Sequence, residues 1–158
     1  MKPILFKAKA LQSGNWVKGL PLKTDMSSRG AFIRQRNFTD DSFDDVKVDR
    51  DTLSEYTGCD DDYDNKIFEG DIVEYNDLKG AKFTGTIVFE NGSFGIGTDE
   101  AIPLEYTRSD NFISLSDIAW FNADIIYDDI FTCLKIIGNI HNNPQIEQNG
   151  SVKETEEK

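Results

Sequence analysis

The sequence predicts a mainly β protein built around a small curled sheet, with an N-terminal β-hairpin and at most one or two short helices. Short runs rich in Val, Ile, Phe and Tyr recur along the chain, and Gly, Asn and Asp residues separate them. An Asn91-Gly92 pair lies between two of these runs, as a two-residue hairpin turn requires. On the strand that follows, Gly95 and Gly97 share one face and predict a sharp bend or the close approach of another backbone.

The predicted β-hairpin lies at the N-terminal end of the sequence. Residues 4–10 end in alternating small apolar and basic side chains, which is typical of a strand with one solvent-facing side. After a turn at residues 13–15, we expect residues 16–20 to return antiparallel to that strand. Residues 31–36 predict one more short strand.

The next stretch is strongly acidic. Residues 40–64 carry eleven Asp or Glu side chains against Lys47 and Arg50. This composition predicts a solvated loop around a short strand near residues 46–48.

The middle of the chain contains the clearest local signals. Residues 71–75 predict a strand, and a turn follows it. The hairpin around Asn91-Gly92 has a register that can be counted from its turn, which places Phe89 opposite Phe94 and Ile87 opposite Ile96. Both pairs then lie on one face and form a cross-strand apolar cluster.

The remaining elements are shorter. Residues 112–115 predict a closing strand, and Ser116 is suited to begin a short helix as its N-cap. Residues 131–140 predict the last strand, which ends before Pro144. Residues 147–158 have almost no apolar content and predict a disordered acidic tail.

The chain length suits one domain. A chain of 158 residues buries about 70% of its unfolded surface, so we expect one domain over residues 1–146, or two small lobes, 1–56 and 57–146. Cys59 and Cys133 lie far apart without C-x-x-C spacing, which indicates neither a zinc site nor a disulfide framework. No apolar run approaches the roughly 20 residues that cross a bilayer, and we expect a cytoplasmic protein.

The net charge of −12 is unevenly distributed. Residues 1–36 contain eight Lys or Arg and one Asp, whereas residues 37–158 contain nine Lys or Arg and 28 Asp or Glu. Such a basic arm either binds nucleic acid or docks on an acidic surface of its own or a neighbouring subunit. We favour the intramolecular or intersubunit contact, because an acidic body repels phosphate.

Three motifs follow one another along the chain: residues 55–58 (EYTG), residues 66–73 (KIFEGDIV) and residues 136–144 (IIGNIHNNP). Together with FKAK and WVKG in the opening hairpin, they resemble the YopX family from residue 1 to about residue 146. The residues that mark the resemblance are Tyr56, Thr57, Gly58, Glu69, Gly70, Asp71, Gly138, Asn139 and Pro144.

This resemblance implies a phage- or prophage-encoded protein of mainly β architecture, with an SH3-like barrel component and no established biochemical activity. There are two departures from the family pattern. The polar turn of the family is usually rich in Lys, whereas residues 59–65 are acidic, and His141 stands where the family has Tyr. If that turn contacts a partner in other members of the family, the resemblance does not imply the same contact here.

The acidic turn partly matches the spacing of a calcium loop. Asp60, Asp62 and Asp64 occupy relative positions 1, 3 and 5, and Asp71 occupies position 12. Yet Asn65 replaces the glycine of position 6, position 12 usually holds Glu, and neither flank predicts a helix. We expect a solvated hairpin loop and no metal site.

No catalytic constellation is visible in the sequence. His141 is the one histidine and lies in a predicted turn, and neither Cys59 nor any serine lies in a known nucleophile motif. A glycine-rich phosphate loop is absent as well, so we expect neither an enzyme nor a cofactor. Some aromatic residues are candidates for ligand contacts, although each suits the core better: Trp16, Tyr56, Tyr75, Phe94 and Trp120.

The expected function is macromolecular binding. In the leading hypothesis, the protein is a phage or prophage accessory protein that binds a host or phage protein or forms a homo-oligomer, without a membrane contact. One alternative is an acidic decoy that imitates nucleic-acid phosphates and occupies a host DNA-binding protein. The other alternative is nucleic-acid binding through the basic residues Lys7, Lys9, Lys18, Arg29, Arg34 and Arg36.

Overall fold

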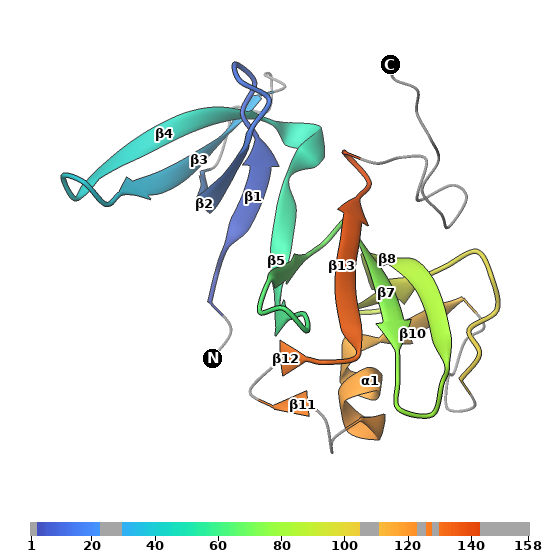
Figure 1. Ribbon diagram of the computed structural model, residues 1–158. Helices are drawn as coiled ribbons and strands as arrows, with labels where there is room; N and C mark the ends of the chain where they lie inside the picture. The colour runs from blue at the N-terminus through green and yellow to red at the C-terminus, as the bar shows by residue number, and fades with distance from the viewer. Residues whose placement is uncertain (1–2, 23–29, 105–110, 123–125, 128–129, 143–158) are drawn as a thin grey trace, which may run out of the picture. The chain divides into compact units, whose positions relative to one another are not determined.

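The computed structural model describes residues 3–22, 30–104, 111–122, 126–127 and 130–142. These residues are mostly β-strand, with one α-helix and one 3₁₀-helix among them, which confirms the mainly β prediction (Figure 1). The chain divides into two compact units, Met1–Tyr56 and Thr57–Lys158. The division falls inside strand β5 (Ser54–Asp60), at the same bond as in the two-lobe alternative.

The N-terminal unit is an antiparallel sheet in the order β5-β1-β2-β3-β4. The 3₁₀-helix η1 (Arg50–Thr52) connects the last of these strands to β5. An isolated bridge between Ala10 and Val48 links the end of the first strand to the last, so the sheet curls back on itself. The bounds of the strands are β1 (Phe6–Lys9), β2 (Trp16–Leu22), β3 (Gly30–Asn37) and β4 (Ser42–Asp49).

The alternation of side chains along these strands separates a core from a second face. Ala8, Ala31, Ile33 and Val48 are buried and form the core of this unit. Because successive side chains of a strand point to opposite sides, the residues between them lie on the other face. Gly19 belongs to the core side, where a Cβ atom would overlap the carbonyl oxygen of Arg34.

Strand β4 corrects the prediction of a mainly solvated loop at residues 40–64. The strand is eight residues long and pairs with β3 along its whole length. Asp45 of this strand lies across from Arg34 of β3, which offsets its charge, whereas Asp44 lies across from Gln35 and Asp49 from Gly30. The acidic composition of this segment indicates a loop, although the segment is a strand that pairs with the arginine-containing strand β3.

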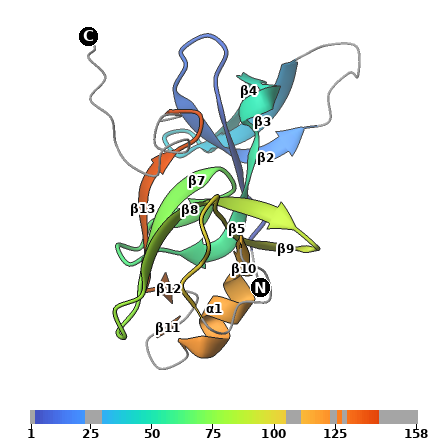
Figure 2. The same cartoon turned by 90° about the vertical axis from the view of Figure 1, so that its right-hand side faces the viewer.

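The C-terminal unit contains a five-stranded antiparallel sheet in the order β10-β9-β8-β7-β13. Its strong curl is visible in Figure 2. Over the described residues the sheet is open, so the barrel-like component implied by the resemblance is a curled sheet and not a closed barrel. The strands are β7 (Asp71–Asn76), β8 (Lys82–Glu90), β9 (Ser93–Gly97), β10 (Phe112–Ser114) and β13 (Leu134–Asn139).

The central hairpin confirms the register counted from its turn. Asn91 and Gly92 have φ values of 52° and 82°, as a type I′ turn requires. Phe89 lies opposite Phe94 with their rings edge to face at 4.9 Å, and Ile87 lies opposite Ile96 in the core. The expected close approach occurs at Gly95, where a Cβ atom would overlap the backbone of β10.

The helix begins earlier than the sequence predicted. Helix α1 (Leu115–Phe121) is capped by Ser114, whose Oγ accepts a hydrogen bond from the backbone N–H of Asp117 at 3.1 Å. Ser116 is therefore not the N-cap, because the chain turns directly from β10 into the helix. Among the described residues, no helix has the length and apolar character needed to cross a membrane.

Three short strands complete the C-terminal unit. The last predicted strand is split by a turn at Thr132 and Cys133, so β12 (Ile130–Phe131) precedes β13. Strand β12 pairs with β11 (Ile126–Tyr127) and, in parallel, with β5, while β6 (Lys66–Phe68) also pairs with β5. The predicted tail at residues 147–158 lies outside the described residues.

Candidate functional site

Basic side chains gather on the second face of the N-terminal sheet. The strand registers bring them together, since Lys7 pairs with Lys18, Arg34 lies next to Leu20, and Lys47 pairs with Phe32. Each of them alternates along its strand with an inward-facing residue. The cations on this surface, which we call the basic–aromatic face, are Lys7, Lys9, Lys18, Arg34, Arg36 and Lys47.

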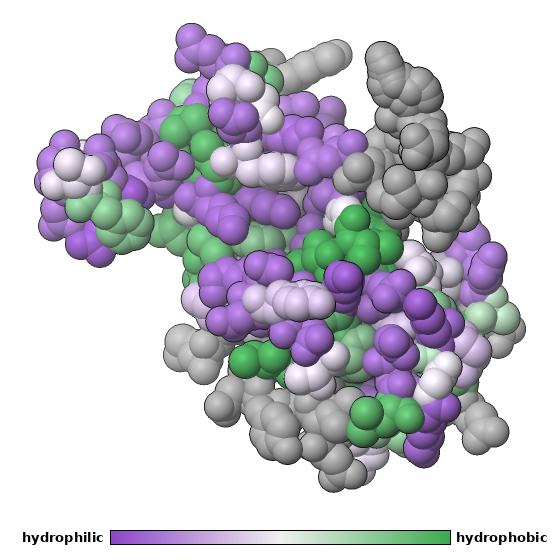
Figure 3. All heavy atoms as spheres, viewed as in Figure 1, coloured by the Kyte–Doolittle hydropathy of each residue, from purple (hydrophilic) through white to green (hydrophobic). Residues whose placement is uncertain are grey.

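Large apolar side chains are exposed between these cations. Phe43 is 63% exposed, Leu20 50% and Phe32 37%. Over the β3–β4 hairpin, hydrophobic side chains stand among hydrophilic ones (Figure 3). Exposed apolar side chains that lie close together are typical of a binding surface.

Trp16 belongs to the same face. The ammonium groups of Lys7 and Lys9 lie 4.6 and 5.5 Å from the centroid of its ring. Both distances are within the range of a cation–π interaction. The indole ring of Trp16 is therefore held beside two ammonium groups of the same face.

The cation Arg34 is paired with an acid on the neighbouring strand. The guanidinium of Arg34 donates to both carboxylate oxygens of Asp45, at 2.8 and 3.0 Å. This pairing lowers the pKa of Asp45 below its ordinary value and raises the pKa of Arg34. Both side chains remain about half exposed, so the pair adds little stability.

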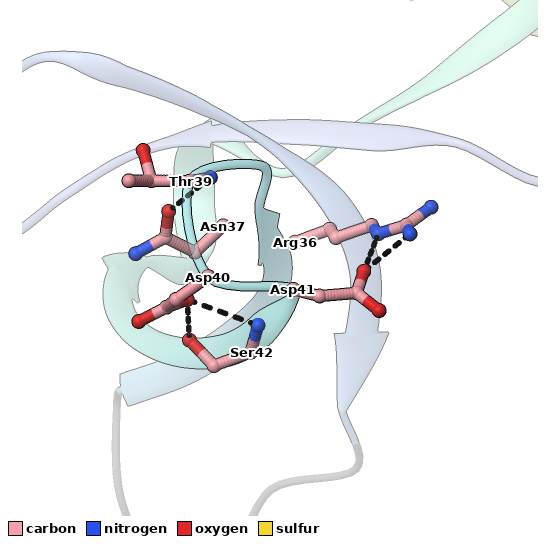
Figure 4. A network of polar contacts seen from close by, with 6 residues as sticks. All are labelled: Arg36, Asn37, Thr39, Asp40, Asp41 and Ser42. Carbon is pink, nitrogen blue, oxygen red and sulfur yellow. Dashed lines mark hydrogen bonds and ion pairs between the residues drawn. The ribbon is translucent and has the colours of Figure 1, made fainter.

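The turn between β3 and β4 is organised by its own polar side chains (Figure 4). Asp41 has a φ of 61° and accepts hydrogen bonds from Arg36. The carboxylate of Asp40 accepts from the hydroxyl and the backbone N–H of Ser42, which lowers the pKa of Asp40. Phe38, at the tip of this turn, is 86% exposed and lies 5.5 Å from the Arg36 guanidinium.

Most of these cations were predicted from the sequence, whereas most of the aromatic side chains were missed. Of the six basic residues proposed for nucleic-acid binding, five lie on the basic–aromatic face, and Arg29 lies outside the described residues. Lys47, Phe32 and Phe43 were missed. The alternation of Val46 and Val48 with Asp45, Lys47 and Asp49 was a period-two strand signal that places Phe43 and Lys47 on one face.

Two of the aromatic residues weighed as ligand contacts belong to the core. Tyr56 is 4% exposed and Tyr75 is fully buried. Trp120, by contrast, is 77% exposed on helix α1.

The acidic turn has a structural role that centres on a residue outside the calcium-like pattern. Asp61 is fully buried, and its carboxylate accepts hydrogen bonds from the backbone N–H groups of Tyr63, Asn65 and Ile136, at 2.8 to 3.1 Å. One carboxylate therefore shapes the turn and attaches it to β13. Asp64, at the turn, has a φ of 64°.

The four candidate metal ligands do not form a site in the described residues. No group of three or more His, Cys, Asp or Glu side chains there is arranged to hold an ion. Asp60 ends strand β5, and Asp62 and Asp64 lie in the exposed part of the turn. Asp71 is 2% exposed and accepts a hydrogen bond from the backbone N–H of Phe68 at 2.8 Å.

The residues that mark the family resemblance hold the C-terminal sheet together. The side-chain amide of Asn139 donates to Asp71 at 2.9 Å, and its oxygen accepts from the N–H of His141 at 2.8 Å. Gly70 has a φ of 90°, and its backbone donates to Ile87 and accepts from Ile140. The second and third motifs therefore meet in one buried polar network.

The first motif has a similar role. The Thr57 hydroxyl donates to the carbonyl of Ile67 at 2.8 Å and accepts from the N–H of Cys59 at 3.1 Å. Gly58 has a φ of 90°, and Gly138 lies where the pairing of β13 with β7 shifts by one residue. Glu69 is in the turn before Gly70, and Pro144 lies outside the described residues.

The two cysteines and the histidine lie in three different settings. Burial raises the pKa of the Cys133 thiol to about 12, so it stays protonated at neutral pH. Cys59 is partly buried. His141 follows strand β13 in a turn, with its backbone bonded to Asn139.

Known proteins provide a family and a fold for this chain. Among solved structures, the crystal structure of protein EF1440 from Enterococcus faecalis is similar, with 19% identity and a TM-score of 0.50. The likeness covers 93% of this chain and 99% of that one, and at this identity it concerns the fold alone. A search of curated proteins finds no match. Residues 5–146 match the family described as YopX protein, and the chain belongs to the YopX family.

Proposed function

We propose that this protein binds an anionic macromolecule through the basic–aromatic face and has no enzymatic activity of its own. The observation that supports the proposal is the collection of six cations and several exposed apolar rings on one side of a single sheet. The packing of the core does not require these large apolar side chains to face solvent. Their exposure therefore favours a surface that binds a partner. In a phage or prophage setting, which the family resemblance implies, the protein would act as an accessory binding factor.

The charge of the two units supports the choice of an anionic partner. Residues 1–56 contain ten Lys or Arg and eight Asp or Glu, whereas residues 57–158 contain seven and 21. The N-terminal unit thus has a net charge of +2 and the C-terminal unit −14. At physiological ionic strength, exposed charges are screened beyond about 8 Å, so a ligand on this face interacts most strongly with the charges of the face itself.

A second candidate partner is another copy of this chain. The net charge of −14 on residues 57–158 makes that unit a complement to the basic–aromatic face. Sedimentation at low and moderate salt checks this candidate. An assembly that dissociates as salt rises supports it, and a monomer under both conditions excludes it.

Two variants test the proposal. One removes two positive charges from the basic–aromatic face, and the other removes two positive charges from the C-terminal unit. Lys18 and Lys47 are exposed on the face, and Lys79 and Lys82 are exposed in the C-terminal unit. On a heparin column, which offers a generic polyanion, we expect Lys18→Gln/Lys47→Gln to elute at lower salt than the wild type. Lys79→Gln/Lys82→Gln, the matched control, is expected to elute with the wild type. Equal elution of all three proteins would contradict the proposal.

A further inference from the structure

We infer that the ligand of the basic–aromatic face is a single-stranded nucleic acid. The inference rests on the proposed function and adds the class of the anionic partner. Two features of the face support it beyond net charge, namely the pairing of aromatic rings with cations and the exposure of those rings.

The first feature is the pairing of aromatic rings with cations. Proteins that bind single strands combine cations for the phosphates with aromatic side chains on which unpaired bases stack. Phe32 and Phe43 lie on neighbouring strands and are offset by four residues, which is about 13 Å along the strands. Each faces a cation across the ladder, Lys47 and Arg36 respectively. Each ring therefore lies next to a cation, and the Arg34–Asp45 pair lies between the two rings.

The second feature is that the exposed rings project from the paired strands β3 and β4, whose residues 35–37 and 42–44 extend beyond the pairing with β2 as a two-stranded ribbon. A two-stranded β-ribbon also fits the major groove of duplex DNA, so the choice between the two ligands rests on the rings. The bases of a duplex are stacked inside it and cannot reach the rings. A single strand laid across the sheet exposes its bases to Phe32, Phe43 and Trp16.

An acidic protein would be attracted by the same cations and would bury the rings as apolar surface, whereas the bases of a nucleic acid stack on their π-faces. The two partners therefore differ in their dependence on Phe43, which is 63% exposed and can be replaced without opening the core. Phe43→Leu keeps an apolar side chain and removes the π-face. Phe43→Trp keeps a ring and is the conservative variant.

The experiment measures fluorescence anisotropy of a labelled 12-nucleotide oligodeoxythymidine strand, the same sequence in a duplex, and labelled polyglutamate. We expect the full-length protein to bind the single strand at least ten-fold more tightly than the other two. Phe43→Leu should weaken this binding roughly 5- to 100-fold, whereas Phe43→Trp should retain it. The matched control is Phe89→Leu, because Phe89 is 53% exposed in the C-terminal unit.

The outcomes separate the inference from the proposed function. Weaker binding by Phe43→Leu alone, with preference for the single strand, supports both. Equal binding of all three probes, unaffected by Phe43→Leu but reduced by Lys18→Gln/Lys47→Gln, overturns the inference and leaves the proposed function in place. Absence of binding to every probe contradicts both.

Discussion

At the scale of single residues, the basic–aromatic face is distinguished by cations that already have acidic partners. Arg34 is paired with Asp45, and Arg36 with Asp41. A paired guanidinium still offers its flat surface for stacking, but a phosphate must compete with the carboxylate for its N–H groups. These acids therefore limit the affinity of the face for a polyanion.

Replacement of Asp45 tests this limit. Asp45→Asn removes one negative charge and releases Arg34, so we expect several-fold tighter binding of single-stranded DNA. The slope of log K against log salt should steepen by about 0.7, the value for one more phosphate contact. Asp44→Asn is the matched control, since Asp44 is exposed on the same strand but alternates onto the other side. Equal effects of both substitutions would contradict the role of Asp45.

The pH dependence of the wild type follows from the direction of the Asp45 shift. Arg34 lowers the pKa of Asp45 below its usual value near 3.8, so the pair is present at neutral pH and is lost only as the pH falls through that lowered pKa. Between pH 8 and pH 5 this pair should therefore not change the affinity. Anisotropy titrations across this range measure the effect.

At the scale of elements, the family motifs work as connections between strands. Asp71 begins β7 and Asn139 ends β13, and both side chains are at least 95% buried. Buried polar groups of this kind are costly when one partner is lost. Asp71 and Asn139, which belong to these motifs, thus connect two strands of the fold.

Exchange of the two residues tests this connection. Asp71→Asn and Asn139→Asp each leave like groups facing one another, and each should lower the free energy of unfolding by about 1–3 kcal/mol. The double exchange restores the pattern, because the new amide at position 71 would accept from Phe68 and donate to the new carboxylate at position 139. We expect it to recover most of the loss. Urea denaturation of the four proteins measures the coupling, and additive losses would contradict it.

The sequence predicted those elements whose geometry is local. The turn at Asn91-Gly92 determines its own hairpin register, so the opposition of Phe89 and Phe94 was predictable. The full length of strand β4 was not predictable. Its acidic composition indicates a loop, and only its pairing with β3 explains why it forms a strand. Asp61 was also missed, since its burial depends on β13, about 75 residues further along the chain.

At the scale of the whole molecule, charge is divided between two compact units. The sequence placed the change of sign at residue 36, whereas the first unit extends to Tyr56 and includes the acidic strand β4. The described basic residues of this segment are therefore not an arm, because they form one face of a folded sheet. This face could not be predicted from composition, since it depends on the pairing of four strands.

The central claim is that a single-stranded nucleic acid lies on the basic–aromatic face. The most direct measurement is photo-crosslinking of the wild-type protein to single-stranded DNA that contains 5-iodouracil, followed by mass spectrometry of the crosslinked peptides. We expect crosslinks at Trp16, Phe32 or Phe43, lost in the presence of unlabelled strand. Crosslinks confined to residues 57–142, or none at all, would contradict the claim.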